Sequence, residues 1–501
     1  MSFFLLDTKS IGAARLAALA LAALLIYVVA KVVYNLFFHP LRKFPGPLLN
    51  RATVFRSTIE MVSGRMPFHV AALHDRYGDV VRIAPNELAF ASAEAWRDIY
   101  GVRNGRELPK APDFYFPSDN IPTSIMNAPS REEHNKLRKA IAPSFSDGAM
   151  RKQEPVISGY VDLLIQRLRE NCDNGKAELD MKDWYTFATF DILGKLAFSQ
   201  DFGCLAASEY HPWVKLISSL ANESAQIAVF MHLGLKWFVN WVSRQPSILK
   251  ARAEHIKHVK EKLEARIALG SQPDIMEGWL KEKEKWNLSE DQWLLNTSQL
   301  IVAGSETTAT LLCGVTYLLL TNPAALAKAT EEVRTTFKSD KDITLLSVMN
   351  LPYLLACLNE ALRRYPSIVG GLPRQTPAGG STIAGKYVAE GTAVAVWQYP
   401  AYHREENFKK PYEYHPERFL GAPEFAGDQL DVLQPFAVGP RDCIGRNLAY
   451  AEMRLIMARV LYNFDLGLAE KSQGWMDKQE AYSLWLKPSL WIKMTPRVFS
   501  G

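Results

Sequence analysis

Cysteine is scarce in this sequence, and its few residues are not arranged in pairs. The five cysteines are scattered, their number is odd, and no C-x-x-C pair occurs. A domain that depends on disulfides for its stability needs paired cysteines and an oxidising environment. We therefore expect no disulfide framework, and we predict that the bulk of the chain lies in a reducing compartment.

The sequence also lacks a dense Lys/Arg stripe, an internal repeat and a low-complexity tract. Its formal charge is +5 and its pI about 8.7, and the 28 prolines are spread along the chain. Hydrophobic residues make up 48% and charged residues 22%, a composition typical of a globular protein with a large core. This excludes a mainly disordered chain and argues against a nucleic-acid partner. The mild positive charge fits an anionic membrane surface or an acidic protein partner.

An uncharged apolar run lies near the amino terminus, from Leu16 to Ala30. Lys31 interrupts the run, and apolar residues then continue to Phe38. A membrane-spanning helix needs about 20 residues, which this region supplies if Arg15 and Lys31 snorkel to the membrane boundaries. The alternatives are a cleaved signal peptide and a buried core helix. We expect a retained membrane anchor over residues 1–38.

The residues around the anchor predict the orientation of the chain. Pro40, Pro45 and Pro47 stop any helix, so residues 39–50 are expected to form a Pro-rich hinge. The remaining residues, 51–501, would form a single globular body. Positive residues flank the span unevenly, with Lys9 and Arg15 before it and Arg42, Lys43, Arg51 and Arg56 after it. The positive-inside rule therefore places the body on the cytoplasmic side.

The pattern of the body predicts a mainly α fold with small β-sheets. Residues 130–365 are mostly helical in pattern. The segments DVVRIAP and NELAFAS predict a hairpin with its turn at Pro85 and Asn86. The segments STIAGKYV and TAVAVWQY alternate like strands on either side of Glu390 and Gly391. Residues 211–245 are rich in Trp and Phe and form either ordinary core or a surface that dips into the bilayer.

A long helix is predicted to cross the interior of the body. Ser289 and Gln292 can form a capping box, and the apolar pattern runs to Pro323, which ends it. A helix of that length measures about 48 Å and is apolar on most sides, so it must be buried. Glu306 and Thr307 lie midway along it, where a carboxylate and a hydroxyl are costly unless partnered or wet. They form either a local groove used in chemistry or a structural acid–alcohol pair.

The sequence FAVGPRDCIGRNLA, residues 436–449, carries the most specific signal. Cys443 lies in a loop between Gly439 and Gly445, and glycine permits a tight loop and close approach of a flat cofactor. A helical stretch follows from Ile444. A cysteine at a helix amino terminus has a lowered pKa, and Arg441 adds positive charge nearby. The alternative is a buried, inert cysteine.

This loop resembles the haem-binding signature of the cytochrome P450 family, F-x-x-G-x-R-x-C-x-G, complete with Phe436, Gly439, Arg441, Cys443 and Gly445. Further family motifs occur in the expected order. They are Ala303–Thr308 (the oxygen-activation motif), Glu360-Ala-Leu-Arg363 (E-x-x-R) and Pro416–Phe419, which contains Arg418. The resemblance covers the chain from the anchor to its end and implies the cytochrome P450 fold around the long central helix.

The resemblance implies a role for each matching residue. Cys443 would be the axial ligand of the iron of haem b, and Glu360, Arg363 and Arg418 would form a structural triad that fixes the loop leading to it. Glu360 and Arg363 share one helical face. In the central helix, Thr307 would position a water and Glu306 would help to relay protons.

Haem propionates would be bound by arginines. His134-Asn-Lys-Leu-Arg138 resembles the family's aromatic-x-x-x-Arg segment, with His134 where many members have Trp. Arg138, Arg374 and Arg441 would then pair with two carboxylates through charge-assisted hydrogen bonds.

The resemblance implies a monooxygenase that oxidises an apolar small molecule by hydroxylation, epoxidation or desaturation, using O₂ and two electrons. The chain has no flavin or iron–sulfur segment, so a separate membrane-bound NADPH–haemoprotein reductase would supply the electrons. Lys139, Arg446 and Arg454 could meet its acidic surface. The RDCIGRNLAYAEMR stretch and the HPLRKFPGP hinge resemble fungal microsomal members that tailor secondary metabolites, including trichothecene-type hydroxylases, and this resemblance implies an endoplasmic reticulum membrane.

Two other functions stay open. One is a haem-thiolate isomerase or dehydratase, against which Glu306 and Thr307 argue, and the other is a non-catalytic haem sensor or carrier. The sequence does not identify the substrate or the oxidised position. The expected walls of the substrate pocket are the segments Ile121–Met126, Ile301–Ser305, Ile368–Leu372 and Ser483–Trp485.

Overall fold

The computed structural model describes residues 8–103, 105–116, 121–482 and 484–498, which are mostly helical with small sheets. The α-helices are α1 (Thr8–Val33), α2 (Leu48–Ala52), α3 (Phe55–Val62), α4 (Met66–Tyr77), α5 (Ala93–Tyr100), α6 (Pro112–Tyr115), α7 (Arg131–Ile141), α8 (Asp147–Asn171), α9 (Met181–Phe198), α10 (Cys204–Ala207), α11 (Pro212–His232), α12 (Lys236–Val242), α13 (Pro246–Ala268), α14 (Met276–Lys281), α15 (Lys283–Trp286), α16 (Glu290–Thr321), α17 (Pro323–Thr336), α18 (Pro352–Arg364), α19 (Gln398–Tyr402) and α20 (Arg446–Asn463). The predicted fold class is confirmed.

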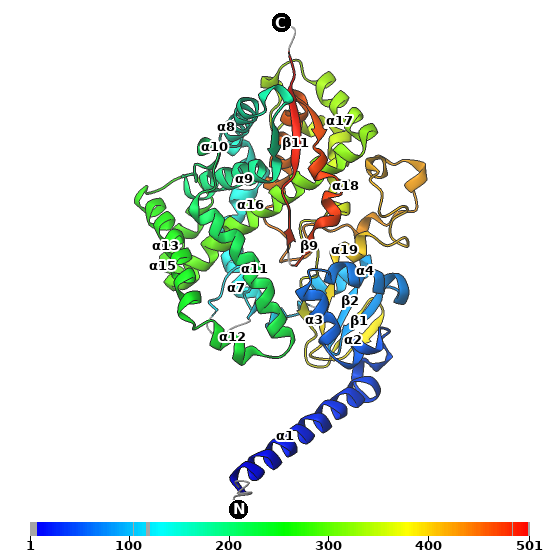
Figure 1. Cartoon of the computed structure of the whole chain (residues 1–501). Helices are drawn as coiled ribbons and strands as arrows, with labels where there is room; N and C mark the ends of the chain where they lie inside the picture. Colours follow the sequence, from blue (N-terminus) through cyan, green and yellow to red (C-terminus); the bar gives the residue numbers. More distant parts are fainter. Residues whose placement is uncertain (1–7, 104, 117–120, 483, 499–501) are drawn as a thin grey trace, which may run out of the picture.

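Helix α1 stands away from the body, as Figure 1 shows. In the part of the chain that the structure describes, one helix, Arg15–Phe38, is long and apolar enough to cross a membrane, and none of its apolar stretch is buried. Its leucines, such as Leu16, Leu19 and Leu25, are exposed. A buried core helix is therefore excluded for this segment.

Hydrogen bonds fix the chain to the body directly after the carboxy-terminal end of α1. A π-helical turn, Tyr34–Phe38, follows α1 directly, and Asn35 in this turn is buried. The Asn35 side chain donates to the Ala52 carbonyl at 2.8 Å, and the Arg82 guanidinium donates to the Asn35 carbonyl at 3.0 Å. The Pro-rich segment 39–50 is itself folded, with Leu41 fully buried. The apolar helix is thus continuous with the body.

A four-stranded sheet lies next to this base. The hairpin of β1 (Val80–Ala84) and β2 (Glu87–Phe90) has the predicted turn, and Val80 pairs with Phe90. Strand β7 (Ala393–Val396) runs parallel to β2, and the short β4 (Arg374–Gln375) pairs antiparallel with β7. The sheet therefore joins the amino-terminal hairpin to a segment about 300 residues later.

The prediction of one strand on each side of Glu390 and Gly391 is partly wrong. STIAGKYV forms not one strand but a hairpin of β5 (Ser381–Ile383) and β6 (Lys386–Val388). Its turn contains Gly385 at φ 72°, a conformation that glycine adopts without strain. The second segment stays extended only to Val396, and α19 then replaces the expected end of the strand.

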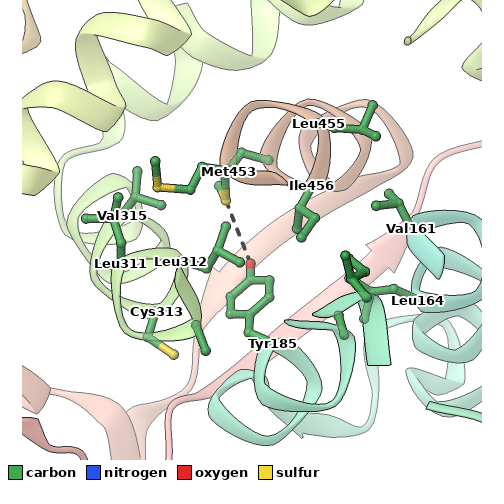
Figure 2. Close-up of a cluster of buried hydrophobic side chains, with 14 of the residues drawn as sticks. Val161, Leu164, Tyr185, Leu311, Leu312, Cys313, Val315, Met453, Leu455 and Ile456 are labelled. Atoms are coloured by element: carbon green, nitrogen blue, oxygen red, sulfur yellow. Dashed lines mark hydrogen bonds between the residues drawn. The ribbon is translucent and has the colours of Figure 1, made fainter. Parts of the chain in front are cut away.

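The predicted central helix is α16, and its capping box is present. The Gln292 N–H donates to Ser289 Oγ at 3.3 Å, and the Ser289 N–H donates to Gln292 Oε1 at 3.0 Å. Helix α16 packs mainly on α9, and α8, α18 and α20 complete the core around it. Figure 2 shows Tyr185 of α9 among apolar side chains of α8, α16 and α20, and its hydroxyl lies 2.8 Å from Thr316 Oγ1. This core holds α16 in a fixed position.

The remaining strands lie in a second sheet and a small hairpin. The second sheet has the order β3 (Glu178–Asp180), β11 (Trp491–Pro496), β8 (Phe464–Leu468), and β9 (Glu480–Ala481) pairs with β10 (Trp485–Leu486).

Residues 211–245 divide between core and surface. Trp213 of α11 is fully buried and packs on Phe202, as expected for core. In α12, Trp237 is 68% exposed and Trp241 is 56% exposed. Helix α12 lies at the end of the body from which α1 departs (Figure 1). The core interpretation therefore holds for Trp213, and the surface that dips into the bilayer stays a prediction for the exposed Trp237 and Trp241.

Candidate active site

Cys443 lies in a loop that leads into α20. The Cys443 N–H donates to the Phe436 carbonyl at 2.8 Å, and the Asp442 N–H donates to the Gly439 carbonyl at 3.1 Å, so the loop closes on itself. Gly439 has a φ of 82°, and a Cβ there would lie 2.1 Å from the Tyr100 carbonyl oxygen at the end of α5. Glycine is therefore required at 439, and the loop is fixed against α5.

Gly445 serves the loop in a different way. Its φ of −84° is open to any residue, so the backbone does not require glycine. The nearest atoms to a Cβ built there are Cys443 Sγ at 3.9 Å and a ring carbon of Phe145 at 4.0 Å. The Cys443 side chain is exposed, whereas the other four cysteines are buried. A Cβ at 445 would make ordinary van der Waals contacts with Cys443 and Phe145, and the exposed face of Cys443 suits a flat ligand.

The electrostatics of Cys443 differ from the expectation. Although the side chain opens to space on one side, the surrounding protein desolvates it, and this raises the pKa of the thiol. The Gly445 N–H hydrogen bond and the charges of Arg138 and Arg446 lower the pKa by less, and Asp442 raises it further. The prediction that the protein alone lowers the thiol pKa is therefore wrong. A coordinated metal ion would supply the deprotonation.

Two arginines clamp the cysteine loop, and both have partners. Arg138 donates to the Asp442 carbonyl oxygen and to Asp442 Oδ1, each at 2.6 Å. Arg441 Nε pairs with Glu107 Oε2 at 2.8 Å, and its Nη1 donates to the Ala128 carbonyl at 2.7 Å. Arg441 is not among the groups that shift the pKa of the Cys443 thiol, so its expected effect there is not confirmed.

Five basic residues form a cluster near the cysteine loop, namely Lys110, His134, Arg138, Arg374 and Arg441. The described residues leave some of its nitrogen atoms without a hydrogen-bond partner. Among the described residues, buried Arg374 Nε and His134 Nδ1 find no hydrogen-bond partner. Desolvation, followed by the charges of Arg374 and Arg441, lowers the pKa of Lys110 to about 6. Desolvation, followed by Arg441 and Arg138, lowers the pKa of His134 to about 4. This surplus of buried donors and charge fits a ligand with carboxylates, as haem has.

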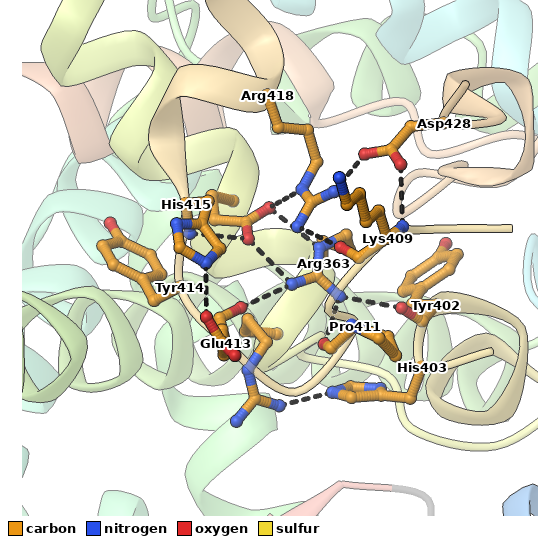
Figure 3. A network of polar contacts seen from close by, with 12 residues as sticks. Arg363, Tyr402, His403, Lys409, Pro411, Glu413, Tyr414, His415, Arg418 and Asp428 are labelled. Atoms are coloured by element: carbon orange, nitrogen blue, oxygen red, sulfur yellow. Dashed lines mark hydrogen bonds and ion pairs between the residues drawn. The ribbon is translucent and has the colours of Figure 1, made fainter. Parts of the chain in front are cut away.

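The predicted triad residues are brought together in a buried network (Figure 3). The side chains of Glu360, Arg363 and Arg418 have no exposed surface. Arg363 Nε and Nη2 donate to the two Glu360 oxygens at 2.8 and 2.7 Å, and Arg418 Nε donates to Glu360 at 3.1 Å. The arginines also bind outside the triad, Arg363 to the carbonyls of Tyr402, Pro411 and Glu413, and Arg418 to Asp428 and the Lys409 carbonyl. The network therefore ties α18 to residues 402–428, before the cysteine loop.

The middle of helix α16 is partly exposed on one side. Ala303 is exposed and Thr307, one turn later, is half-buried, although the helix crosses the interior. The Thr307 hydroxyl donates to the Ala303 carbonyl at 2.7 Å, and Ser367 Oγ donates to the Thr307 carbonyl at 2.8 Å. The Thr307 hydroxyl is thus held by its own helix and lies beside open space. Glu306 has a partner of its own, because its carboxylate pairs with the ammonium of Lys487.

Two of the expected pocket walls are each bonded to a residue a few positions from another expected wall. The Ile125 N–H donates to Asn296 Oδ1 of α16 at 2.8 Å. The indole of Trp485 donates to the Pro366 carbonyl at 2.8 Å, next to the segment Ile368–Leu372. Ser483 lies outside the described residues.

Sequence reasoning missed four partners of the predicted residues, namely Lys110, Glu107, Asp428 and Lys487. None of them belongs to a motif. Lys110, Glu107 and Lys487 lie far along the chain from their partners, whereas Asp428 follows Arg418 by ten positions. For Lys110 and Lys487, the single cue is a lysine in a mainly apolar or aromatic stretch, LPKAPDFY or LWLKPSL, and this cue is too weak to single them out.

Comparisons with known proteins agree with this geometry. The sequence model described as Cytochrome P450 matches residues 45–494. A cytochrome P450 monooxygenase of Talaromyces stipitatus is 50% identical over 489 residues, which cover 96% of this chain and 95% of that protein. A cytochrome P450 monooxygenase of Penicillium brasilianum is 43% identical, with 95% and 98% covered. Averantin hydroxylase of Dothistroma septosporum is 41% identical, with 95% and 91% covered. The chain therefore belongs to the cytochrome P450 family and is a monooxygenase of that family.

Proposed function

We propose that this chain uses haem b to oxidise an apolar small molecule with O₂ and two electrons. The observation that carries the proposal is the exposed Cys443 beside Gly445, in a loop bonded to basic groups near which buried nitrogen atoms of the described residues lack partners. Bound haem supplies the iron that activates O₂, and a thiolate ligand favours O–O cleavage. Cys443 would be the iron ligand, in a loop formed by Phe436, Gly439 and Gly445.

The propionates of the haem would take up the surplus donors of the basic cluster. Among the described residues, Arg374 and His134 have buried nitrogen atoms without partners, and the charges of Arg138 of α7 and Arg441 of the cysteine loop act on His134. We add Lys110 to this set, because its pKa shows that Arg374 and Arg441 act on it. A carboxylate near Lys110 would favour the charged form of its amine.

Two residues of α16, Glu306 and Thr307, would supply protons to the oxygen site. Thr307 would turn its hydroxyl from the Ala303 carbonyl to a water in the adjoining space, and Glu306 would supply protons to that water. General acid–base catalysis needs a donor within hydrogen-bond reach, directly or through one water. The triad of Glu360, Arg363 and Arg418 would act on stability alone.

The membrane and the redox partner are proposed from the surface. Residues 1–38 would anchor the chain as a single span in the endoplasmic reticulum membrane, with 39–50 joining it to the body, 51–501, on the cytoplasmic side. Trp237 and Trp241 would form a second contact with lipid, since Trp favours the membrane interface. A membrane-bound NADPH–haemoprotein reductase would supply electrons.

The proposed docking face of the reductase is the basic surface near Cys443. Lys139 and Arg446 are exposed there, whereas Arg454 is half-buried with its guanidinium 5.3 Å from the Tyr450 ring centre. Acidic groups of a reductase would pair first with the two exposed cations.

The substrate class is proposed from the relatives. Averantin hydroxylase of Dothistroma septosporum acts, by its name, on averantin, and a compound of fungal secondary metabolism is proposed as the substrate of this chain. Trichothecene-type terpenoids are a second candidate class. Hydroxylation, epoxidation and desaturation all use the same site residues.

Product analysis with ¹⁸O₂ tests the proposal. The full chain would be produced in membranes with an NADPH–haemoprotein reductase and supplied with averantin and with candidate terpenoids. Hydroxylation or epoxidation adds one ¹⁸O atom to the product, whereas desaturation removes two hydrogens and adds none. An isomerase or dehydratase would form product without NADPH. A haem protein that consumes no NADPH in the presence of the reductase, with or without these compounds, would refute the proposed function.

A further inference from the structure

A buried lysine contacts the acid of the central helix. The Lys487 side chain is 4% exposed and its ammonium pairs with the Glu306 carboxylate, which is 23% exposed. The same ammonium donates to Thr310 Oγ1 at 2.7 Å. Glu306 and Thr310 are one turn apart, so Lys487 contacts a single face of α16.

The side chains of Glu306, in its ion pair, and Thr307 lie on different faces of α16. Successive residues of an α-helix point about 100° apart, and the Thr307 hydroxyl is bonded along its own face to the Ala303 carbonyl. The Glu306 carboxylate faces the carboxy-terminal segment. A proton held there needs a water, or a rotation of the side chain, to reach the hydroxyl of Thr307.

The backbone on both sides of Lys487 is fixed. Two residues before it, the Trp485 indole donates to the Pro366 carbonyl at 2.8 Å in a buried position. Three residues after it, the Leu490 N–H donates to Asp180 Oδ1 at 2.8 Å. The backbone that carries Lys487 is therefore held on both sides of the residue whose ammonium contacts α16.

Stability alone is a weak reason for this pair. Removing two charges from water costs several kcal/mol per ion, and a well-packed apolar pair at such a position is often as stable. Lys487 contacts an acid next to the proposed oxygen site, and a role in positioning that acid explains the lysine better than a role in stability. The Thr310 contact also gives Lys487 a second fixed point, so the geometry of the carboxylate is well defined.

We propose that Lys487 is a positioning residue for Glu306, holding its carboxylate at one place on α16 from which protons are passed toward Thr307. The proposal rests on the proposed function of Glu306 as a proton relay. It concerns how protons reach the site and not how substrate or haem is bound.

The partition of electrons between peroxide and water tests this proposal without a substrate. One NADPH, one proton and O₂ give NADP⁺ and hydrogen peroxide, whereas two NADPH, two protons and O₂ give two NADP⁺ and two waters. Poor proton delivery favours peroxide. NADPH, O₂ and peroxide would be measured for the full-length holoenzyme with reductase, in H₂O and in D₂O.

The variants are Lys487→Met, Lys487→Arg and the matched control Lys493→Met, an exposed lysine of the same segment. Lys487→Met should lower the water-forming rate by on the order of 10- to 100-fold, since misplacing a group by about 1 Å can cost that much. It should also raise the solvent isotope effect. Lys487→Arg should restore most of the rate, and Lys493→Met should match the wild type.

A double variant separates positioning from folding. Lys487→Met in a Glu306→Gln background leaves no unpaired charge and should add nothing to the effect of Glu306→Gln. The proposal is overturned if Lys487→Met behaves as wild type, or if its effect is undiminished in the Glu306→Gln background. If Lys487→Met loses its haem, the comparison of the double variant with Glu306→Gln decides alone. If Glu306→Gln itself equals wild type, the proposed role of Glu306 fails instead.

Discussion

Replacing Arg363 by alanine should unfold the haem-binding body under conditions in which the wild type is stable. Its guanidinium is fully buried and makes five hydrogen bonds, two to Glu360 and three to backbone carbonyls. Breaking a buried ion pair costs about 3–5 kcal/mol, and the abandoned carbonyls add to that cost. Since domains are stable by about 5–15 kcal/mol, we expect haem-depleted, largely insoluble protein.

The control is an exposed pair with the same spacing. Arg167 and Glu170 are also three residues apart with a 2.7 Å contact, but their side chains are 29% and 42% exposed. Arg167→Ala should therefore cost less than about 1 kcal/mol. Urea unfolding followed by haem absorbance, together with the haem content per protein, measures both variants. Equal losses for Arg363→Ala and Arg167→Ala would refute the argument from burial.

Three further predictions address the iron ligand, proton delivery and the membrane. Cys443→Ser should abolish the thiolate-type absorbance of the reduced, CO-bound protein, and a normal thiolate spectrum would disprove the ligand assignment. Thr307→Ala should keep its haem but lose product per NADPH by up to about 10²–10⁴-fold, with peroxide rising instead; unchanged coupling would make Thr307 structural. Deleting residues 1–38 should leave partial binding to lipid vesicles in a flotation assay. Adding Trp237→Ser and Trp241→Ser should remove that binding, and full solubility of the deletion alone would contradict the second contact.

Features fixed by neighbouring residues were predictable from the sequence. The capping box of Ser289 and Gln292, and the ends of α16 and α18 at Pro323 and near Pro366, depend on contacts within one or two turns. The split of the expected strand at Gly385 was missed because a glycine in a short alternating run does not distinguish a strand from a turn.

Partners far apart in the chain could not be predicted. Lys487 and Glu306 are separated by 181 positions, and Arg441 and Glu107 by 334. Such pairs depend on how helices and sheets pack, which no local pattern encodes. The pKa of Cys443 was mispredicted for the same reason, because its desolvation comes from the folded surroundings of the loop.

The junction at Asn35 has a mechanical consequence for the whole molecule. Because the helix from the amino terminus runs without interruption into a bonded turn, rotation of that helix about its axis must rotate the body with it. A body joined by a flexible linker would sample every orientation relative to the helix, whereas a body joined by a rigid connection keeps one orientation. Inserting a Gly-Ser stretch between Val33 and Tyr34 would uncouple the two while preserving every residue of both, and fluorescence anisotropy of a dye on the body would report the gained freedom.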